Sequence, residues 1–159
     1  MKNKTEARGV FALNKRARYD YSILETLEAG IVLKGTETKS IKTGGKVHFK
    51  DAYIRLINQE FYLVNCYITP YAFGTHENHD ATRSRKLLLH KKEGLKLWQK
   101  TQEKGLSLIP LNFHSRRHII KLEIGLGKGK KQYEKREDLK KKNLEREMSR
   151  SLSSDRIKI

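Results

Sequence analysis

Two neighbouring stretches decide the fold: Leu106–Phe113 reads LSLIPLNF, and His118–Leu126 reads HIIKLEIGL. From Ile120 to Leu126 apolar residues occupy every second position, which is the period of a strand with one buried face. The residues between the two stretches, HSRR at 114–117, are enough for a short loop. The pattern therefore predicts an antiparallel β-hairpin.

Shorter strands and helices are expected on the N-terminal side of this hairpin. The expected strands are 31–33, 53–57, 61–68 and the brief apolar run 87–89. The expected helices are 36–43 and 90–104, the second with a stop at Gly105. A loop is expected at 71–84. About six strands with two or three short helices in about 115 residues are typical of a closed or nearly closed antiparallel barrel. We predict a mainly β fold, a β-barrel with short flanking helices and a disordered basic tail.

The chain of 159 residues is expected to form one domain with two appendages. Residues 1–13 show neither helix nor strand period and are predicted to be a mobile leader. Residues 14–127 carry nearly all the large apolar side chains and form the predicted barrel. Residues 128–159 contain 12 basic and 6 acidic residues and only a thin apolar stripe. We expect this tail to be disordered alone and helical when bound.

The net charge indicates a polyanionic partner. Lysine and arginine number 35 against 18 acidic residues, a surplus of +17. Nucleic acid is the first candidate, and an anionic membrane surface is the second. A membrane partner would require a basic helix with a broad apolar face, and we find none in the sequence. The single cysteine, Cys66, excludes internal disulfides, and there is no apolar span or secretory signal. We expect a soluble protein of a reducing compartment, the cytoplasm.

Catalytic and metal-binding patterns are weak in this sequence. His76, His79 and Asp80 have a spacing that could ligate a metal, but without a full ligand set we interpret them as part of a solvated loop. Cys66 lies in an alternating strand and is predicted to be a packed small side chain. Paired carboxylates, a nucleophile motif and a phosphate-binding loop are not found in the sequence. The prediction is a protein that is not an enzyme and that needs no cofactor or metal.

Basic clusters carry the stronger signal. Lys15–Arg18 is followed directly by Tyr19–Tyr21, so that cations and aromatic rings alternate as in proteins that bind RNA loops. Arg83–Lys86 forms a second cluster and Lys128–Lys131 a third. The glycine-rich stretch 125–131 is interpreted as a hinge with phosphate contacts. Each cluster could be merely a solvated surface, but three of them in so basic a chain favour contact with nucleic acid.

Two motifs resemble a known family. Asn14–Tyr21 and Glu28–Ser40 are closely similar to the SsrA-binding proteins, also called small protein B, of bacterial trans-translation. Further matches run collinearly through 50–53, 68–70, 78–80, 85–91 and 128–138. Tyr19 departs from the pattern, since the family usually has histidine there.

The resemblance implies a fold and a function. The fold is an OB-type β-barrel that binds the tRNA-like domain of transfer-messenger RNA (tmRNA, SsrA) and replaces the missing anticodon half of a tRNA. The family delivers this RNA to stalled ribosomes, alongside elongation factor Tu, for tagging of the nascent chain and ribosome rescue. Its C-terminal tail folds into a helix in the empty mRNA channel and reports to the decoding centre.

The resemblance and the charge pattern together define the expected site. By motif match, the positions that bind RNA are Asn14, Tyr21 and Glu28. Charge adds Lys15, Arg16, Arg18, Arg85, Lys86, Lys128, Lys130 and Lys131. For the tail at the decoding centre the expected residues are Tyr133, Lys135 and Arg136. Glu28 cannot serve phosphates, so it would accept hydrogen bonds from base edges or orient a neighbouring arginine.

Two other functions stay open at this point. A general basic ribosome-associated RNA-binding or chaperone protein would show broad RNA affinity and would lose little without its tail. A nuclease or RNA-modifying enzyme would need acid–base residues that the sequence does not show.

Overall fold

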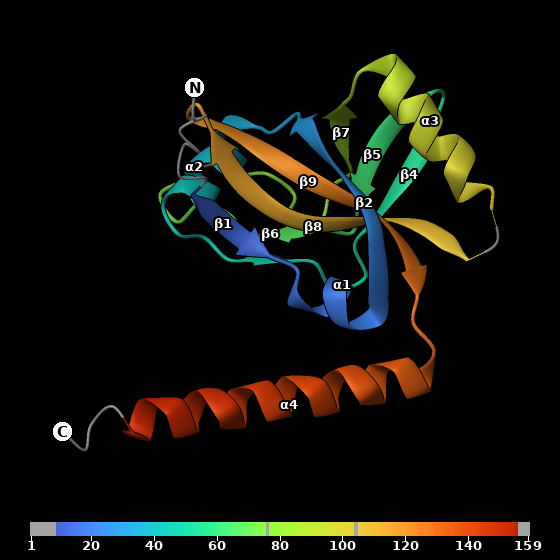
Figure 1. Ribbon diagram of the computed structural model, residues 1–159. Helices are drawn as coiled ribbons and strands as arrows, with labels where there is room; N and C mark the ends of the chain where they lie inside the picture. Colours follow the sequence, from blue (N-terminus) through green and yellow to red (C-terminus); the bar gives the residue numbers. More distant parts are fainter. Residues whose placement is uncertain (1–8, 76, 104, 156–159) are drawn as a thin grey trace, which may run out of the picture. The chain divides into compact units, whose positions relative to one another are not determined.

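The predicted hairpin is the longest strand pair of the computed structural model, which describes residues 9–75, 77–103 and 105–155 (Figure 1). Strands β8 (Leu106–Arg116) and β9 (Ile119–Gly129) pair antiparallel along their whole length. The two residues of the turn, Arg117 and His118, both have positive φ, as in the two-residue turns that match the twist of a hairpin. The hairpin prediction is confirmed, with longer strands and a tighter turn than expected.

The other strands extend this hairpin into one sheet. They are β1 (Val10–Leu13), β2 (Tyr21–Ile31), β4 (Tyr53–Ile57), β5 (Glu60–Val64) and β7 (Arg85–Leu88). The order in the sheet is β1-β8-β9-β2-β7-β5-β4, with antiparallel neighbours throughout. A second small sheet pairs β3 (Val47–His48) with β6 (Tyr67–Ile68). Because β4 at one edge also contacts β8 near the other edge, the large sheet curls into an open barrel, which confirms the predicted mainly β fold.

Three short helices flank the barrel: α1 (Lys15–Asp20), α2 (Gly35–Lys42) and α3 (Lys91–Thr101). The helices expected at 36–43 and 90–104 are therefore confirmed as α2 and α3. Helix α3 ends at Thr101, with Gln102 as its C-cap, which is earlier than the stop expected at Gly105. Gly105 has the left-handed φ of +84°, but it lies in the turn between α3 and β8. Helix α1 was not predicted, because its six residues are too few to show a helical period.

The core lies on the face of β9 that the alternation predicts. Ile120, Leu122, Ile124 and Leu126 are each at most 5% exposed, and they pack with Phe113 and with apolar residues of β5, β6 and β7. A smaller apolar cluster of Ala17, Ile109 and Leu111 lies apart from it, with Tyr21 and Ile23 packed against it. The barrel thus has a main core and a satellite cluster that involves α1.

Several expected segments differ from the structure. Residues 10–13, expected in a mobile leader, form β1 on the edge of the sheet, while residues 1–8 lie outside the described residues. The strand expected at 31–33 is β2, which starts ten residues earlier and ends at Ile31. The strand expected at 61–68 is divided near Asn65, whose φ is +56°. Residues 125–129 of the glycine-rich stretch, expected to act as a hinge, are instead part of the strand β9. Each difference comes from long-range pairing, which local periodicity does not report.

The chain divides into two compact units, residues 1–129 and 130–159. The second unit contains helix α4 (Gln132–Asp155). Its apolar stripe at Leu144, Met148 and Leu152 is 58%, 58% and 67% exposed, so it makes no core. Within the described residues, no helix has the length and apolar character needed to cross a membrane.

Candidate nucleic-acid interface

Asn14 holds the basic helix α1 against the barrel. Its side-chain oxygen accepts a hydrogen bond from the backbone N–H of Ala17 at 3.1 Å, which caps the helix. Its side-chain NH₂ donates to the carbonyl of Pro110 at 2.8 Å, and its backbone N–H donates to that of Leu111 at 2.7 Å. Both ends of the amide are thus engaged within the protein. Asn14 positions the cations of α1, and direct contact with RNA stays a prediction for this residue.

The inner side of α1 is apolar and closely packed. Ala17 is 3% exposed and lies against Ile109 and Leu111 of β8, with Tyr21 beside it. A Cβ at Gly127 of β9 would come within 2.8 Å of Ile109 and 3.1 Å of the Cβ of Tyr21. A side chain at position 127 would therefore force the tip of Ile109 to turn away and the start of β2 at Tyr21 to shift slightly, so glycine suits the close packing here.

The outer side of α1 carries the predicted cations. Lys15, Arg16 and Arg18 are all exposed, while Tyr21 is half-buried. Arg16 pairs with Asp20 one turn later at 3.1 Å, a solvent-exposed contact. The first cluster predicted from the sequence is therefore a compact basic surface on a helix whose position is held by Asn14 and Ala17.

A groove of about 1200 Å³ opens on the same unit, between β2, β7, the β4–β5 turn and α3. Glu28 of β2, Arg116 of β8 and Lys121 of β9 line one part of it. Leu88 and Leu95, each 54% exposed, supply apolar surface in the same groove. Cations beside apolar surface in a groove are suited to phosphates and unstacked bases together.

Glu28 lies at the centre of a polar network on this wall. Its carboxylate accepts hydrogen bonds from Nε2 of His114 at 2.9 Å and from Nη1 of Arg116 at 2.7 Å. Burial by itself raises the pKa of Glu28, but the hydrogen bonds from His114 and Arg116 outweigh it and hold the pKa below its ordinary value. Glu28 is thus an anion that orients Arg116, which is one of the two roles expected for it.

Sequence reasoning missed Arg116 and Lys121. The sequence pattern predicts a loop at residues 114–117 and gives no indication that their cations line a binding site. The structure carries β8 through Arg116 and brings it to Glu28, which is 88 residues away along the chain. The adjacent Arg116–Arg117 pair was a basic cluster that could have been noted, but only the strand pairing shows which wall it lines.

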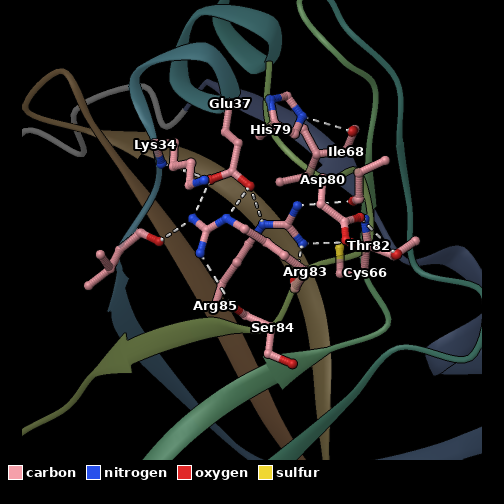
Figure 2. A network of polar contacts seen from close by, with 12 residues as sticks. Lys34, Glu37, Cys66, Ile68, His79, Asp80, Thr82, Arg83, Ser84 and Arg85 are labelled. Carbon is pink, nitrogen blue, oxygen red and sulfur yellow. Dashed lines mark hydrogen bonds and ion pairs between the residues drawn. The ribbon is translucent and has the colours of Figure 1, made fainter. Parts of the chain in front are cut away.

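The prediction that Arg85 binds RNA is wrong. Its side chain is fully buried, and Nε donates to Glu37 at 2.8 Å (Figure 2). Its remaining nitrogens donate to the carbonyls of Cys66 at 2.6 Å, Arg83 at 2.9 Å and Ala81 at 3.0 Å. The alternation of β7 turns Arg85 inward, so its charge serves the fold rather than a ligand.

Glu37 is the shared partner in this buried network. It accepts from Arg83 at 2.5 and 2.9 Å and from the backbone N–H of Lys34 at 2.7 Å, as Figure 2 shows. Burial by itself raises the pKa of Glu37. The hydrogen bonds from Arg83 and Lys34 and the charge of Arg85 outweigh this effect, so the pKa lies below its ordinary value and the carboxylate stays ionised. The network ties α2 to the segment before β7.

Lys86, the next residue along, has the opposite orientation. Its side chain is 40% exposed, lines the groove, and pairs with Glu60 at 2.5 Å. Lys128, near the end of β9, is also exposed. These two lysines remain candidates for RNA contact.

The other predicted cations belong to the second unit. Lys130 pairs with Asp138 at 2.5 Å, and the backbone N–H of Lys131 donates to Glu134 at 2.7 Å. Helix α4 then places its aromatic and basic candidates in its first turns, with Tyr133 58% exposed. Those candidates are Tyr133, Lys135 and Arg136.

The histidine and cysteine candidates are structural where they are described. His79, expected in a solvated loop, is 5% exposed, with Nε2 3.1 Å from the carbonyl of Ile68 and Nδ1 3.0 Å from the hydroxyl of Thr36. That expectation was wrong because the loop folds back on α2; His76 lies outside the described residues. Among the described residues no cluster of three potential ligands could hold a metal. Cys66 is fully buried, as predicted, and burial raises the pKa of its thiol to about 12.

An antiparallel open barrel with a capped basic helix and a cation-lined groove defines a nucleic-acid-binding β-barrel protein. Comparison with known proteins identifies the particular family. The profile of the family described as "SmpB protein" matches residues 11–154, and the chain belongs to this family. The resemblance inferred from the sequence motifs is thus confirmed.

Curated relatives match over nearly their whole length. The SsrA-binding protein of Enterococcus faecalis is 50% identical over 147 residues, which cover 92% of this chain and 95% of the relative. That of Aquifex aeolicus is 52% identical over 139 residues, which cover 87% and 88%. A solved structure titled "tmRNA-SmpB: a journey to the center of the bacterial ribosome" contains a similar chain, with 50% identity, a TM-score of 0.64, and coverage of 76% of this chain and 85% of that one.

Proposed function

We propose that this protein is a non-catalytic adaptor that binds transfer-messenger RNA and delivers it to stalled ribosomes for nascent-chain tagging and ribosome rescue. The observation that carries the proposal is the match, at about half identity and over most of the chain, to proteins named for binding SsrA RNA. The solved neighbour, whose title places tmRNA and SmpB in the bacterial ribosome, supports the same partners.

The barrel supplies the contact with the tRNA-like domain of the RNA. The basic face of α1, with Lys15, Arg16 and Arg18, is suited to phosphates, because its charges project from a helix that is capped by Asn14 and packed on the barrel through Ala17. The groove around Glu28 and Arg116 offers a second contact, at which an oriented guanidinium can pair with phosphate or a base edge. Elongation factor Tu is then a partner indirectly, through the charged RNA.

The tail acts on the ribosome in this proposal. Helix α4 exposes its apolar stripe, and nothing described within its unit buries it, so the helix has no tertiary support of its own. We expect it to be largely disordered in the free protein and to form in the mRNA channel, where rRNA offers anionic walls. Tyr133 would then stack on bases of the decoding centre, and Lys135 and Arg136 would contact phosphates.

The contact of α1 is tested by the salt dependence of tmRNA binding. Replacing Arg16 and Arg18 by alanine is expected to weaken binding and to flatten the slope of log K against log salt by about 0.9 for each lost phosphate contact. A matched control removes two exposed cations elsewhere, Lys50 and Arg55, and is expected to leave the slope within half of that change. Equal effects of both double variants, or comparable affinity for unrelated RNA, would instead favour a general RNA chaperone.

The role of the tail is tested by truncation after Gly129. The truncation removes 11 basic and 6 acidic residues from a chain of net charge +17, so the body keeps +12. We expect tmRNA affinity to stay within about tenfold, since the phosphate-binding face of α1 is intact. Tagging on stalled ribosomes should be abolished, and full tagging by the truncated protein would refute the assignment.

A further inference from the structure

Both ring nitrogens of His114 face hydrogen-bond acceptors. The side chain is 4% exposed on β8, with Nε2 2.9 Å from the carboxylate of Glu28. Its other nitrogen, Nδ1, lies 2.9 Å from the side-chain oxygen of Asn112. A neutral imidazole has one N–H and one lone pair, so it can donate to only one of these two partners.

The orientation of Asn112 is determined by a third residue. Its NH₂ donates a hydrogen bond to the carboxylate of Glu123 on β9. An ionised carboxylate has no proton, so it can accept hydrogen bonds but cannot donate them. The amide oxygen must therefore face His114. Glu28 is likewise an anion that also accepts from Arg116. With an acceptor on each side, the network is satisfied only when the ring donates from both nitrogens.

We propose that His114 is a buried imidazolium that positions Glu28, and through it Arg116, in the RNA groove, and that RNA affinity falls when His114 loses its proton. The part that concerns RNA rests on the function proposed above. His114 is a positioning residue in this scheme, since it contacts Glu28 rather than the RNA.

The charges around the ring explain why a cation is needed there. Glu28 of β2 lies directly opposite Glu123 of β9, and like charges in opposed positions of a sheet destabilise it. His114 is bonded to Glu28 directly and to Glu123 through Asn112, so its charge offsets both carboxylates. The other charged groups near the ring are Arg116 on β8 and Lys121 on β9, and Lys121 is the register partner of His114. On the other side, the residue of β1 that pairs with His114 is the uncharged Val10.

Loss of the proton would disturb the groove in a defined way. A neutral ring would place a lone pair against either Glu28 or the oxygen of Asn112, and the charge that balances the two carboxylates would be gone. With the lone pair toward Glu28, the carboxylate would move or take up a proton. With the lone pair toward Asn112, Glu28 would keep its hydrogen bond but would lose the positive charge beside it. Either change weakens the hold of Glu28 on Arg116.

His79 provides an internal comparison. It is also buried between two hydrogen-bonding groups, but one of them is the hydroxyl of Thr36, which can donate as well as accept. Its ring can therefore be neutral, with the Nε2 proton donated to the carbonyl of Ile68. The two histidines should differ in protonation although both are almost fully buried.

The first experiment reads the ring of His114 directly. The full chain, labelled with ¹⁵N in its histidines and assigned with the variant His114→Gln, is followed by NMR between about pH 6 and about pH 9 without RNA. We expect both nitrogens of His114 to carry protons at neutral pH, while His79 shows a single neutral tautomer. A neutral tautomer of His114 at neutral pH would overturn the proposal, whatever the protein binds.

The second experiment measures affinity for a transcribed tRNA-like domain of tmRNA over the same pH range. The wild-type affinity should fall about tenfold in step with the deprotonation seen by NMR. His114→Gln should be about tenfold weaker at neutral pH and insensitive to pH, because it keeps a donor toward Glu28 but not the charge. The control His118→Asn, at the exposed turn of the same hairpin, should keep the wild-type profile.

The outcomes separate the two proposals. Wild-type affinity that does not follow the deprotonation of His114, or a His114→Gln protein that binds like wild type, would overturn the positioning role. If His114→Gln fails to fold, the wild-type pH profile still decides. Absence of binding to this RNA at every pH would overturn the proposed function, while the NMR experiment would still establish the charge of His114.

Discussion

Replacing Arg85 by methionine is expected to damage stability and not RNA recognition. The sequence places Arg85 and Lys86 side by side in one basic cluster, yet the strand β7 turns one inward and the other outward. Methionine has a similar reach without the charge. The substitution therefore leaves Glu37 with Arg83 as its one remaining charged partner among the described hydrogen bonds, and it removes a donor from the carbonyl of Cys66.

The magnitude follows from the burial of the pair. Both side chains of the Arg85–Glu37 pair are 0% exposed, and removing one partner of a buried ion pair costs about 3–5 kcal/mol. With a urea m-value of about 2 kcal/mol/M, the unfolding midpoint should move down by about 2 M. The pair of Lys86 with Glu60 is about two-fifths exposed on each side, so Lys86→Met should cost at most about 1 kcal/mol.

Urea unfolding followed by circular dichroism measures the loss of stability in each variant. RNA titration at several salt concentrations measures whether the variant has lost a contact with RNA. Lys86→Met should flatten the salt slope by about 0.9 if it loses one phosphate contact, whereas Arg85→Met should leave the slope unchanged under conditions in which it is folded. An unfolding midpoint of Arg85→Met within about 0.5 M of wild type, or a flattened slope in that variant alone, would refute this reasoning.

Three further predictions concern the fold. Gly94→Ala should destabilise α3 by about 1–2 kcal/mol despite its better helix propensity, since the new Cβ would lie 2.7 Å from the ring of Phe61; Gly35→Ala, which meets no atom within 4 Å, is the control in urea unfolding. The pKa of Glu37 is lower in the folded than in the unfolded chain, so its contribution to stability is complete above its ordinary value of 4.5 and is lost as the pH falls toward the folded value. Stability measured across that range should fall more steeply for wild type than for Glu37→Gln. Cys66, with a buried thiol of pKa about 12, should react with a thiol reagent at neutral pH only when the protein is unfolded in urea.

Local pattern alone determined the hairpin and the two longer flanking helices. The alternation from Ile120 to Leu126 is a property of consecutive residues, and the period of 36–43 is likewise contained in one short window. The same holds for the basic surface of α1, because Lys15–Arg18 are neighbours in sequence. Signals of this kind need no knowledge of what the segment packs against.

Tertiary structure alone decided the edge strands and the orientation of individual charges. Strand β1 exists because β8 offers an unpaired edge, and no period in residues 10–13 records that edge. Arg85 and Lys86 have the same charge in the sequence, and only the pairing of β7 with β5 and β2 decides which of them is buried.

The groove around Glu28 shows most clearly which features the sequence reports and which depend on the tertiary structure. Family motifs pointed to Glu28, but His114 and Arg116, its hydrogen-bond partners, come from the strand β8, more than 80 residues later in the chain. Charge and hydrophobicity are properties of residues and can be read in order along the chain. Hydrogen bonds and burial are properties of pairs, and they exist only once strands distant in sequence have been brought into register.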